Sequence, residues 1–398
     1  MVELPVVLIT EILSRLPVKS LLRFLCVCKP WYSIIKDPHF IKLHLKHSLE
    51  NLTNQTLIIR DSYLYSLDFP ALSFVTRIDH PLESDGRGTE LLGSSNGLLC
   101  LSNGDDEGVN GTIFYNPATR THHQLPVSDI EFPDTAFCCD RTVYGFGYDH
   151  VTDDYKLVRV IQFMGDDEFD SEVKVYGLKS GSWRRIRDFP RGFYLTYKRA
   201  WGFYVNGCLH WVVTRNPEYD GTKLIVALDI GSEEYKIVPQ PRYSDGEFHM
   251  NVGVLKGCLY VLCNYVSVKT ELWVMEEYGV RNSWTMLFSI LQDGIIGCFE
   301  YVRPLGRYGS RVLVEKDGKH LIWFDSETQT IENVEVRGLP PLLDAEMLVE
   351  SLVPLECRGK VKPKMKKNKS KRKQKKSRDK RDDDDMSGFL SKGFKLKL

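Results

Sequence analysis

The 398-residue sequence lacks any uninterrupted apolar run of the ~20 residues that a transmembrane helix needs. It also lacks the basic N-terminal segment of a secretory signal peptide, and Glu3 and Glu11 interrupt its first apolar stretch. We therefore expect a soluble protein inside the cell. The length favours a small module joined to a larger one.

The cysteines and histidines form no pattern of a metal site. No two cysteine pairs stand at the spacing of a zinc ribbon, zinc finger or RING domain, and a strand would point the adjacent His122 and His123 to opposite faces. Gly145-Phe146-Gly147 lacks the third glycine and the helix of a phosphate-binding loop. We expect free thiols, no metal, no cofactor and no catalytic residues.

The net charge of zero conceals a split between body and tail. From Arg358 onward there are 18 Lys/Arg and 5 Asp/Glu, which leaves 35 basic and 48 acidic residues in the preceding 357. An acidic body therefore carries a basic tail. Because residues 360–381 offer almost no apolar surface to bury, we expect the tail to be disordered.

The first fifty residues predict four short helices. Proline stands where the first should begin, at Pro5, and Pro17 should end it; Asp37 should cap a fourth that begins at Pro38. The apolar positions are Leu8, Ile9, Ile12, Leu13 and Leu16 in the first helix, Leu21, Leu22, Phe24, Leu25 and Val27 in the second, Trp31, Ile34 and Ile35 in the third, and Phe40, Ile41, Leu45 and Leu49 in the fourth. A module of about 45 residues cannot bury so many apolar faces, so surface remains for a partner.

This segment closely resembles the F-box, whose plant versions typically read LPxxLxxEILxRLPVKSLLRFxCVCKxW. The matching positions are Leu4, Pro5, Leu8, Glu11 to Leu13, Arg15 to Phe24, Cys26 to Lys29 and Trp31. The resemblance implies binding to the Skp-type adaptor of cullin-based SCF ubiquitin ligases. It assigns the contact to Leu4, Pro5, Leu8, Ile12, Leu16, Pro17, Leu21 and Leu22.

Some positions depart from the F-box pattern. Val6 and Val7 stand where an acidic residue is common, Leu25 replaces an arginine, and Pro30 replaces a serine that would cap the third helix. Losing that cap should cost ~1 kcal/mol without loss of the fold. The alternative is an ordinary four-helix core that binds no partner.

After Gln55 the pattern changes to alternating apolar residues with Gly, Asn and Asp turns, which predicts antiparallel β-structure. Turn glycines followed by apolar strands recur about fifty residues apart, a period typical of kelch-like propeller blades, at Gly97, Gly147, Gly207, Gly257 and Gly309. A second hairpin recurs in copies that begin at Leu64, Ile113, Val173, Ile225, Leu272 and Leu321. Thr56–Arg60 and Glu346–Leu352 are apolar segments that could share a blade and close the ring. The fold class is therefore mainly β, a propeller of about six blades after a small helical domain.

The body resembles the F-box-associated domain of plant F-box proteins, often described as F-box/kelch-repeat. SSNGLLCL, YNPATR, GFGYD with DDYKLVRV, VYGLKSGSW, VNGCLHWV and ALDI carry the resemblance. These motifs predict scaffolding, with turns at Asn96 and Asn116 and core positions at Trp183, Trp201 and Trp211. Target binding is expected in loops, at Asp105–Asn110, Asp166–Asp170, Pro217–Thr222 and Tyr243–His249, although acidic loops are often only solvated.

The basic tail fits a nuclear localisation signal, which predicts a protein of nucleus and cytoplasm with the nucleus favoured. The residues of this signal are Lys364, Lys366, Lys367, Lys369, Lys371, Arg372, Lys373, Lys375 and Lys376. A merely solvated tail and a nucleic-acid contact are alternatives. The absence of an aromatic residue before Phe389 disfavours base stacking.

We predict three parts: a helical F-box domain over 1–50, a kelch-like propeller over 56–357 and a disordered tail over 358–398. The leading hypothesis is a non-catalytic substrate-recognition subunit of an SCF-type ubiquitin ligase. It would bind the adaptor, and through it a cullin, by the F-box and an unknown target by the propeller, leading to ubiquitination and degradation of the target. The alternative is a nuclear scaffold or nucleic-acid-associated protein that acts through the tail. A propeller enzyme with a metal in its central channel is a third hypothesis, which the missing ligand set disfavours.

Overall fold

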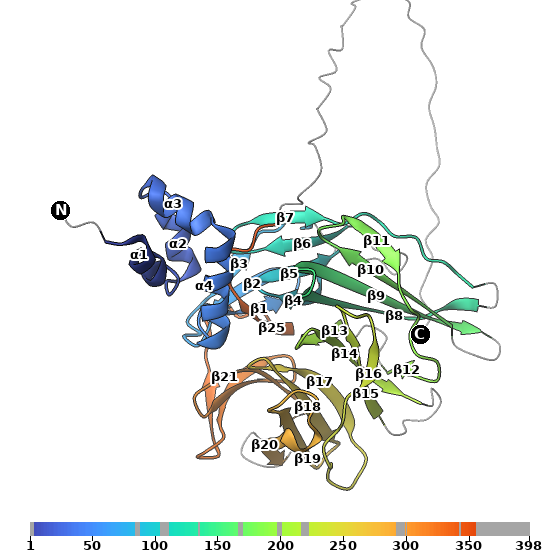
Figure 1. Cartoon of the computed structure of the whole chain (residues 1–398). Coiled ribbons are helices and arrows are strands. Elements are labelled where there is room, and N and C mark those ends of the chain that lie inside the picture. The colour runs from blue at the N-terminus through green and yellow to red at the C-terminus, as the bar shows by residue number, and fades with distance from the viewer. Residues whose placement is uncertain are drawn as a thin grey trace, which may run out of the picture. The chain divides into compact units, whose positions relative to one another are not determined.

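The structure is a computed structural model that describes residues 4–83, 88–103, 111–133, 136–165, 170–196, 201–215, 223–291, 299, 301–341 and 344–355. The chain divides into two compact units, Met1–Arg358 and Gly359–Leu398, and every described residue belongs to the first. In that unit four helices stand at one end of a body of strands (Figure 1). Within the described ranges, no helix has the length and apolarity needed to cross a bilayer.

The four predicted helices are confirmed as α1 (Val6–Leu13), α2 (Val18–Phe24), α3 (Lys29–Lys36) and α4 (Pro38–Glu50). Pro5 is the residue before α1, not its first residue, and α1 ends at Leu13, ahead of Pro17. Asp37 caps α4 as predicted, since its Oδ1 accepts hydrogen bonds from the amides of His39 at 2.7 Å and Phe40 at 3.4 Å. The α3 N-terminus has no side-chain cap, in keeping with Pro30.

Among the described residues the strands group into six four-stranded antiparallel units, two of which belong to one nine-stranded sheet, and we call them blades 1 to 6. Blade 1 contains β25 (Asp344–Val349), β1 (Gln55–Arg60), β2 (Leu64–Asp68) and β3 (Val75–Ile78). Blade 2 contains β4 (Glu90–Ser95), β5 (Leu98–Ser102), β6 (Thr112–Asn116) and β7 (Thr121–Gln124). Blade 3 contains β8 (Ala136–Asp149), β9 (Asp154–Gly165), β10 (Asp170–Gly177) and β11 (Ser182–Arg185).

Blade 4 contains β13 (Trp201–Val205), β14 (Cys208–Thr214), β15 (Lys223–Asp229) and β16 (Tyr235–Ile237), with the short β12 (Tyr194–Leu195) paired to β14. Blade 5 contains β17 (His249–Leu255), β18 (Cys258–Tyr265), β19 (Lys269–Met275), the 3-10 helix η1 (Arg281–Ser283) and β20 (Trp284–Leu291). Blade 6 contains β21 (Val302–Tyr308), β22 (Arg311–Lys316), β23 (His320–Asp325) and β24 (Thr330–Val334). Two parallel residue pairs join the inner strands of blades 3 and 4, so these two blades share one sheet. The arrangement of the strands in blades confirms the predicted propeller class.

The ring closes through the two ends of the body, as the sequence predicts. β25 pairs antiparallel with β1, with Ala345 opposite Ile59 and Leu348 opposite Thr56. The chain after β25 is held by Asn116, whose Nδ2 donates to the carbonyls of Ser351 at 3.1 Å and Val353 at 2.9 Å. Blade 1 is therefore built from residues at opposite ends of the body.

The turns between the first two strands of several blades confirm the repeat. Asn96–Gly97 and Asn206–Gly207 both have positive φ at both positions, the geometry of a tight two-residue hairpin turn. The six predicted outer hairpins are also confirmed. The prediction of a turn at Gly147 is wrong, because this residue lies inside β8. A Cβ there would stand 2.3 Å from Cδ2 of Tyr204. This glycine makes room for a blade 4 side chain and forms no turn.

The strand directions give the propeller two distinct faces. Each inner strand, such as β4 or β13, begins at one face and ends at the other. We call the face where the inner strands end the helix face, because its turns contact the helices: Lys42 Nζ lies 2.8 Å from Oδ1 of Asp153, and Lys19 Nζ lies 3.1 Å from Oδ1 of Asp68. The opposite face, from which the inner strands start, is the distal face.

The helices and the propeller share a hydrophobic core. Leu13, Leu21 and Ile35 of the helices belong to the same buried cluster as Phe114 and Leu157 of the blades. Of the three tryptophans predicted as core, Trp211 is buried as expected. Trp183 and Trp201 are only half-buried, which corrects the prediction for them.

Candidate binding surfaces

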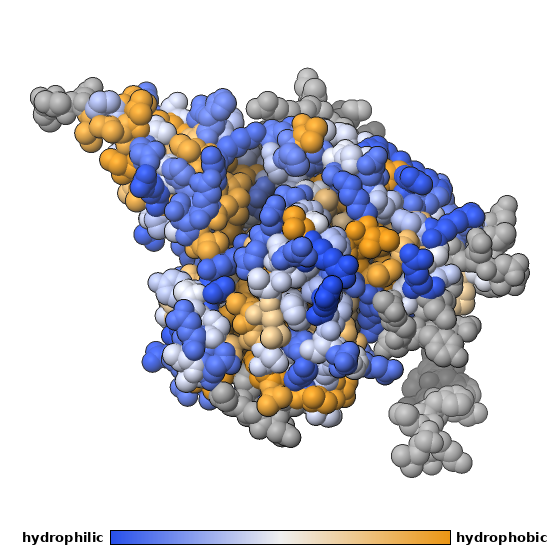
Figure 2. Space-filling view, turned by 60° about the horizontal axis from the view of Figure 1, so that its bottom comes forward, coloured by the Kyte–Doolittle hydropathy of each residue, from blue (hydrophilic) through white to orange (hydrophobic). Residues whose placement is uncertain are grey.

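The N-terminal helices expose an apolar face that no described residue covers. Leu4, Val7, Leu8 and Ile12 are exposed to 58%, 77%, 49% and 55%, and Pro5 beside them is exposed. Figure 2 shows hydrophobic, orange surface at the end of the molecule where the helices lie. The valines at the two positions that depart from the acidic F-box pattern enlarge this face. Exposed apolar clusters of this kind mark protein contacts.

The other residues that the sequence assigns to adaptor binding lie differently. Pro17 is exposed, whereas Leu16 and Leu22 are half-buried against the shared core. Leu21 has no exposed surface and packs in that core. A fully enclosed side chain cannot contact a partner directly, so we remove Leu21 from the proposed binding face. A helix that is apolar on most sides does not reveal in sequence which side is buried.

The distal face collects the ends of the strands that flank the predicted target-binding loops. Tyr243–His249 is described and leads into β17 at this face, where Tyr243 and Phe248 pack with ring centroids 5.0 Å apart. Asp105–Asn110, Pro217–Thr222 and residues 166–169 lie outside the described residues. Their flanking strands, including β5, β9 and β14, all run from the helix face to the distal face. Tyr243–His249 therefore lies at the distal face, opposite the helices, and the described strands that precede the other three segments end at that face.

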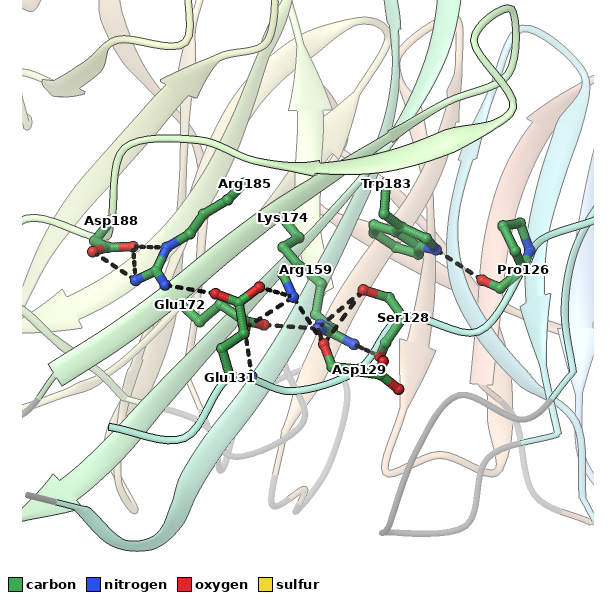
Figure 3. Close-up of polar contacts among 10 residues, drawn as sticks. All are labelled: Pro126, Ser128, Asp129, Glu131, Arg159, Glu172, Lys174, Trp183, Arg185 and Asp188. Carbon is green, nitrogen blue, oxygen red and sulfur yellow. Dashed lines mark hydrogen bonds and ion pairs between the residues drawn. The ribbon is translucent and has the colours of Figure 1, made fainter. Parts of the chain in front are cut away.

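A buried ionic network fixes the segment that connects blade 2 to the distal end of blade 3 (Figure 3). Arg159 donates to Oε1 of Glu172 at 2.7 Å and to the carbonyl of Ser128 at 2.8 Å. Glu172 Oε2 lies 3.2 Å from Lys174 Nζ and accepts from the Glu131 amide at 2.8 Å. The three charged side chains that β9 and β10 contribute to this network, Arg159, Glu172 and Lys174, are all buried.

The sequence motifs predict only scaffolding for this part of blade 3. A signal was present, since Lys156 and Arg159 interrupt the apolar residues of DDYKLVRV. Nothing in one strand alone shows that its charges meet those of the next. The network is structural in character: each buried charge has an opposite charge or a carbonyl as partner.

His122 and His123 point to opposite faces of β7, as the sequence predicts for adjacent residues of a strand. His122 is exposed, while His123 on the other face of β7 is half-buried and its Nε2 lies 2.7 Å from the Tyr176 hydroxyl. In the part of the chain that the structure describes, no three His, Cys, Asp or Glu side chains gather as metal ligands. The eight described cysteines are all unpaired, as predicted. Gly145 and Gly147 lie in strand β8.

A cavity of about 380 Å³ lies among the inner strands of the propeller. Five aromatic side chains line it, Phe146, Trp201, Phe203, Tyr204 and Tyr260, together with Ser94, Ser95 and Glu346. Leu49 and Leu52, at and after the end of α4, border it as well. Sequence analysis did not find this cavity, because its walls come from strands that are far apart in the chain.

A small helical module joined to a propeller of kelch-like blades defines a class of two-domain binding proteins. The comparison with known families gives this class its name: residues 1–43 match the F-box domain, and residues 56–339 match the F-box associated beta propeller domain. The chain belongs to the F-box proteins with an F-box associated propeller.

Several relatives come from Arabidopsis thaliana. The chain is 37% identical to F-box protein CPR1 and 33% identical to F-box protein At4g22390, in both cases over the full length of both chains. It is 33% identical to F-box/kelch-repeat protein At3g23880, over 76% of this chain and 82% of the relative. The similarity therefore extends through both the helices and the propeller.

Proposed function

We propose that this protein is a substrate-recognition subunit of an SCF-type ubiquitin ligase. The observation that carries the proposal is the exposed apolar face of α1 on a chain whose other part is a propeller with a free distal face. The helices would bind a Skp-type adaptor, and through it a cullin. The distal face would bind the target, which is then ubiquitinated and degraded.

In this function the protein supplies no catalytic group. It raises the effective concentration of the target beside subunits that perform the transfer. The two binding surfaces lie at opposite ends of the first unit, so one chain can hold both partners without overlap. Membership in the F-box proteins supports the adaptor side of this assignment, and the target remains to be identified.

The double substitution Leu4→Ala with Pro5→Ala tests adaptor binding. Both side chains are exposed, so the fold should be unaffected, whereas loss of one binding hot spot of about 2 kcal/mol weakens the complex about 30-fold. We expect the double variant to lose the Skp-type adaptor in co-purification and calorimetry. The matched control is Val266→Ala with Val268→Ala, two exposed apolar residues on the β18–β19 turn at the distal face.

The control variant should keep the adaptor. Absence of adaptor binding by the wild-type protein would refute the proposal. Proximity labelling under proteasome inhibition then identifies the target: it should be captured by both the wild type and the adaptor-deficient variant, but carry ubiquitin only with the wild type.

We further propose that the protein works in the nucleus as well as the cytoplasm, because its lysine-rich tail fits an import signal. The residues of that signal, Lys364 to Lys376, lie outside the described residues. The same tail is the basis of the alternative function, a nuclear scaffold or nucleic-acid-associated protein. Strongly salt-dependent nucleic-acid binding that requires these lysines would favour the alternative.

A further inference from the structure

The cavity among the inner strands contains a carboxylate whose hydrogen bonding is incomplete. Oε1 of Glu346 accepts from Ser94 Oγ at 2.6 Å, whereas Oε2 is buried and has no partner among the described residues. The hydroxyl of Ser95, on the same wall, is also buried without a partner. Buried polar groups without partners are rare in folded proteins, so a hydrogen-bonding ligand in this cavity would complete the bonding of both groups.

Arg60 and Arg303 pair with carboxylates other than Glu346. Arg303 Nε donates to Oε2 of Glu315 at 3.1 Å, and its guanidinium lies 3.5 Å from Oδ1 of Asp344. Arg60 Nε donates to the other oxygen of Asp344 at 2.9 Å. Both arginines are thus engaged by other carboxylates. No ion pair of Glu346 is found within the described part of the chain.

The walls suit a positively charged organic group. Aromatic faces attract a cation through their quadrupole, and five aromatic residues are among those that line the cavity together with Glu346. The volume of about 380 Å³ lies in the range of small-molecule sites. The terminal torsion of a glutamate is soft, so its free oxygen can turn toward a ligand in the cavity.

We propose that this cavity is a binding site for a small organic ammonium ion, whose N–H groups donate to Glu346 while its apolar body packs on the aromatic walls. The site is separate from the adaptor-binding face. Lys256 and Arg307 also line the cavity and disfavour a second positive group, so the ligand is a monoamine. Because Leu49 and Leu52 border the site, the bound ligand would contact the junction of helices and propeller.

The test uses benzylamine and benzoate, which share a ring and differ in charge, with the full-length protein in isothermal titration calorimetry. We expect saturable benzylamine binding, and benzoate binding at least about tenfold weaker, since a hydrogen bond to a charged group is worth roughly one decade or more in affinity. A cavity that holds only water would show no saturable benzylamine binding up to its solubility limit, which would overturn the proposal.

Glu346→Gln keeps the size of the side chain and removes its charge. This substitution should weaken benzylamine binding about tenfold or more. The matched control is Glu335→Gln, at an exposed glutamate directly after β24, which should leave benzylamine binding unchanged. Equal binding by wild type and Glu346→Gln would contradict the site. If Glu346→Gln does not fold, Ser95→Ala tests the same wall.

The wild-type protein offers a second readout. Burial raises the pKa of Glu346 to about 7, with Asp344 adding to the effect and Ser94 and Arg303 opposing it. Tyr260 is another titratable group that interacts with it, and Lys256 and Arg307 are the charged groups that line the same cavity. The ammonium needs the ionised carboxylate, so benzylamine affinity should rise between about pH 6 and pH 8. An affinity that is flat over this range would contradict the role of Glu346.

Discussion

Glu172 has no exposed surface, yet it lies between Arg159 of the neighbouring strand β9 and Lys174 of its own strand β10. Removing water from charges costs several kcal/mol for each, which their mutual attraction offsets only while every partner stays in place. Arg159 and Lys174 donate to carbonyls of residues 128 and 129 as well, so the network ties the connecting segment to blade 3. The loss of one member therefore affects the others.

Replacing Glu172 by Gln should lower the free energy of unfolding by about 3–5 kcal/mol, because Arg159 then stays buried without its counter-charge. Asp188→Asn is the matched control within the same group of residues (Figure 3). Asp188 pairs with Arg185 at 3.0 Å at the surface, and such pairs contribute less than about 1 kcal/mol. Urea unfolding of the two variants measures both values; similar losses would show that the buried network contributes no more than the surface pair.

Single residues differ in how well the sequence predicts their place. Asn96 and Asn116 are found in turns as predicted, since a turn depends on local chemistry: Asn116 Oδ1 accepts from the amides of Ala118 and Thr119. Leu21 and Trp201 were misplaced because burial depends on what packs against them. Those neighbours come from other helices and blades, which local patterns do not specify.

At the scale of the element, β25 is the strand on which the ring depends. It supplies Ala345 and Leu348 to the core of blade 1, and the chain after it supplies Leu352, Val353 and Leu355 to the core shared with the helices. All five side chains are buried. Full burial of a large apolar side chain contributes about 1.5–3 kcal/mol to the free energy of unfolding. The summed contribution of these side chains is therefore comparable with the whole net stability of a domain.

A chain that ends at residue 343 should therefore fail to fold into a stable propeller. We expect it to lose cooperative thermal unfolding in circular dichroism and to elute as aggregates, because β1 would be left with an open edge. A chain that ends at residue 358 keeps β25 and its following segment and should unfold like the full-length protein. Cooperative unfolding of the shorter chain near the wild-type temperature would rule out this role for β25.

At the scale of the whole molecule, the sequence predicts the order of parts and the repeat better than the sites. Helices and hairpins follow from spacing, caps and turns within ten to twenty residues, and the closure of the ring was found because both of its segments are apolar and lie at the ends of the body. The glycine period was less reliable: Gly147 has the right spacing but serves interblade packing. The cavity at Glu346 needs six blades in place before it exists.

Deletion of residues 359–398 tests the import proposal for the whole molecule. Because the removed segment contains the lysine cluster, a fluorescent fusion of the shortened protein should shift from nucleus to cytoplasm in live-cell imaging. A fusion that lacks only residues 382–398 keeps the cluster and should remain nuclear. Nuclear accumulation of the shorter fusion would exclude the tail as the import signal.

The pairing of β1 with β25 also has a consequence for synthesis on the ribosome. Arg60 and Asp344, which form an ion pair across these strands, are 284 positions apart. At a translation rate of about 5–20 residues per second, β1 waits roughly 15–60 s for its partner. During that time the nascent chain presents an unpaired apolar strand edge, so productive folding depends on keeping that edge covered until the last blade strand emerges.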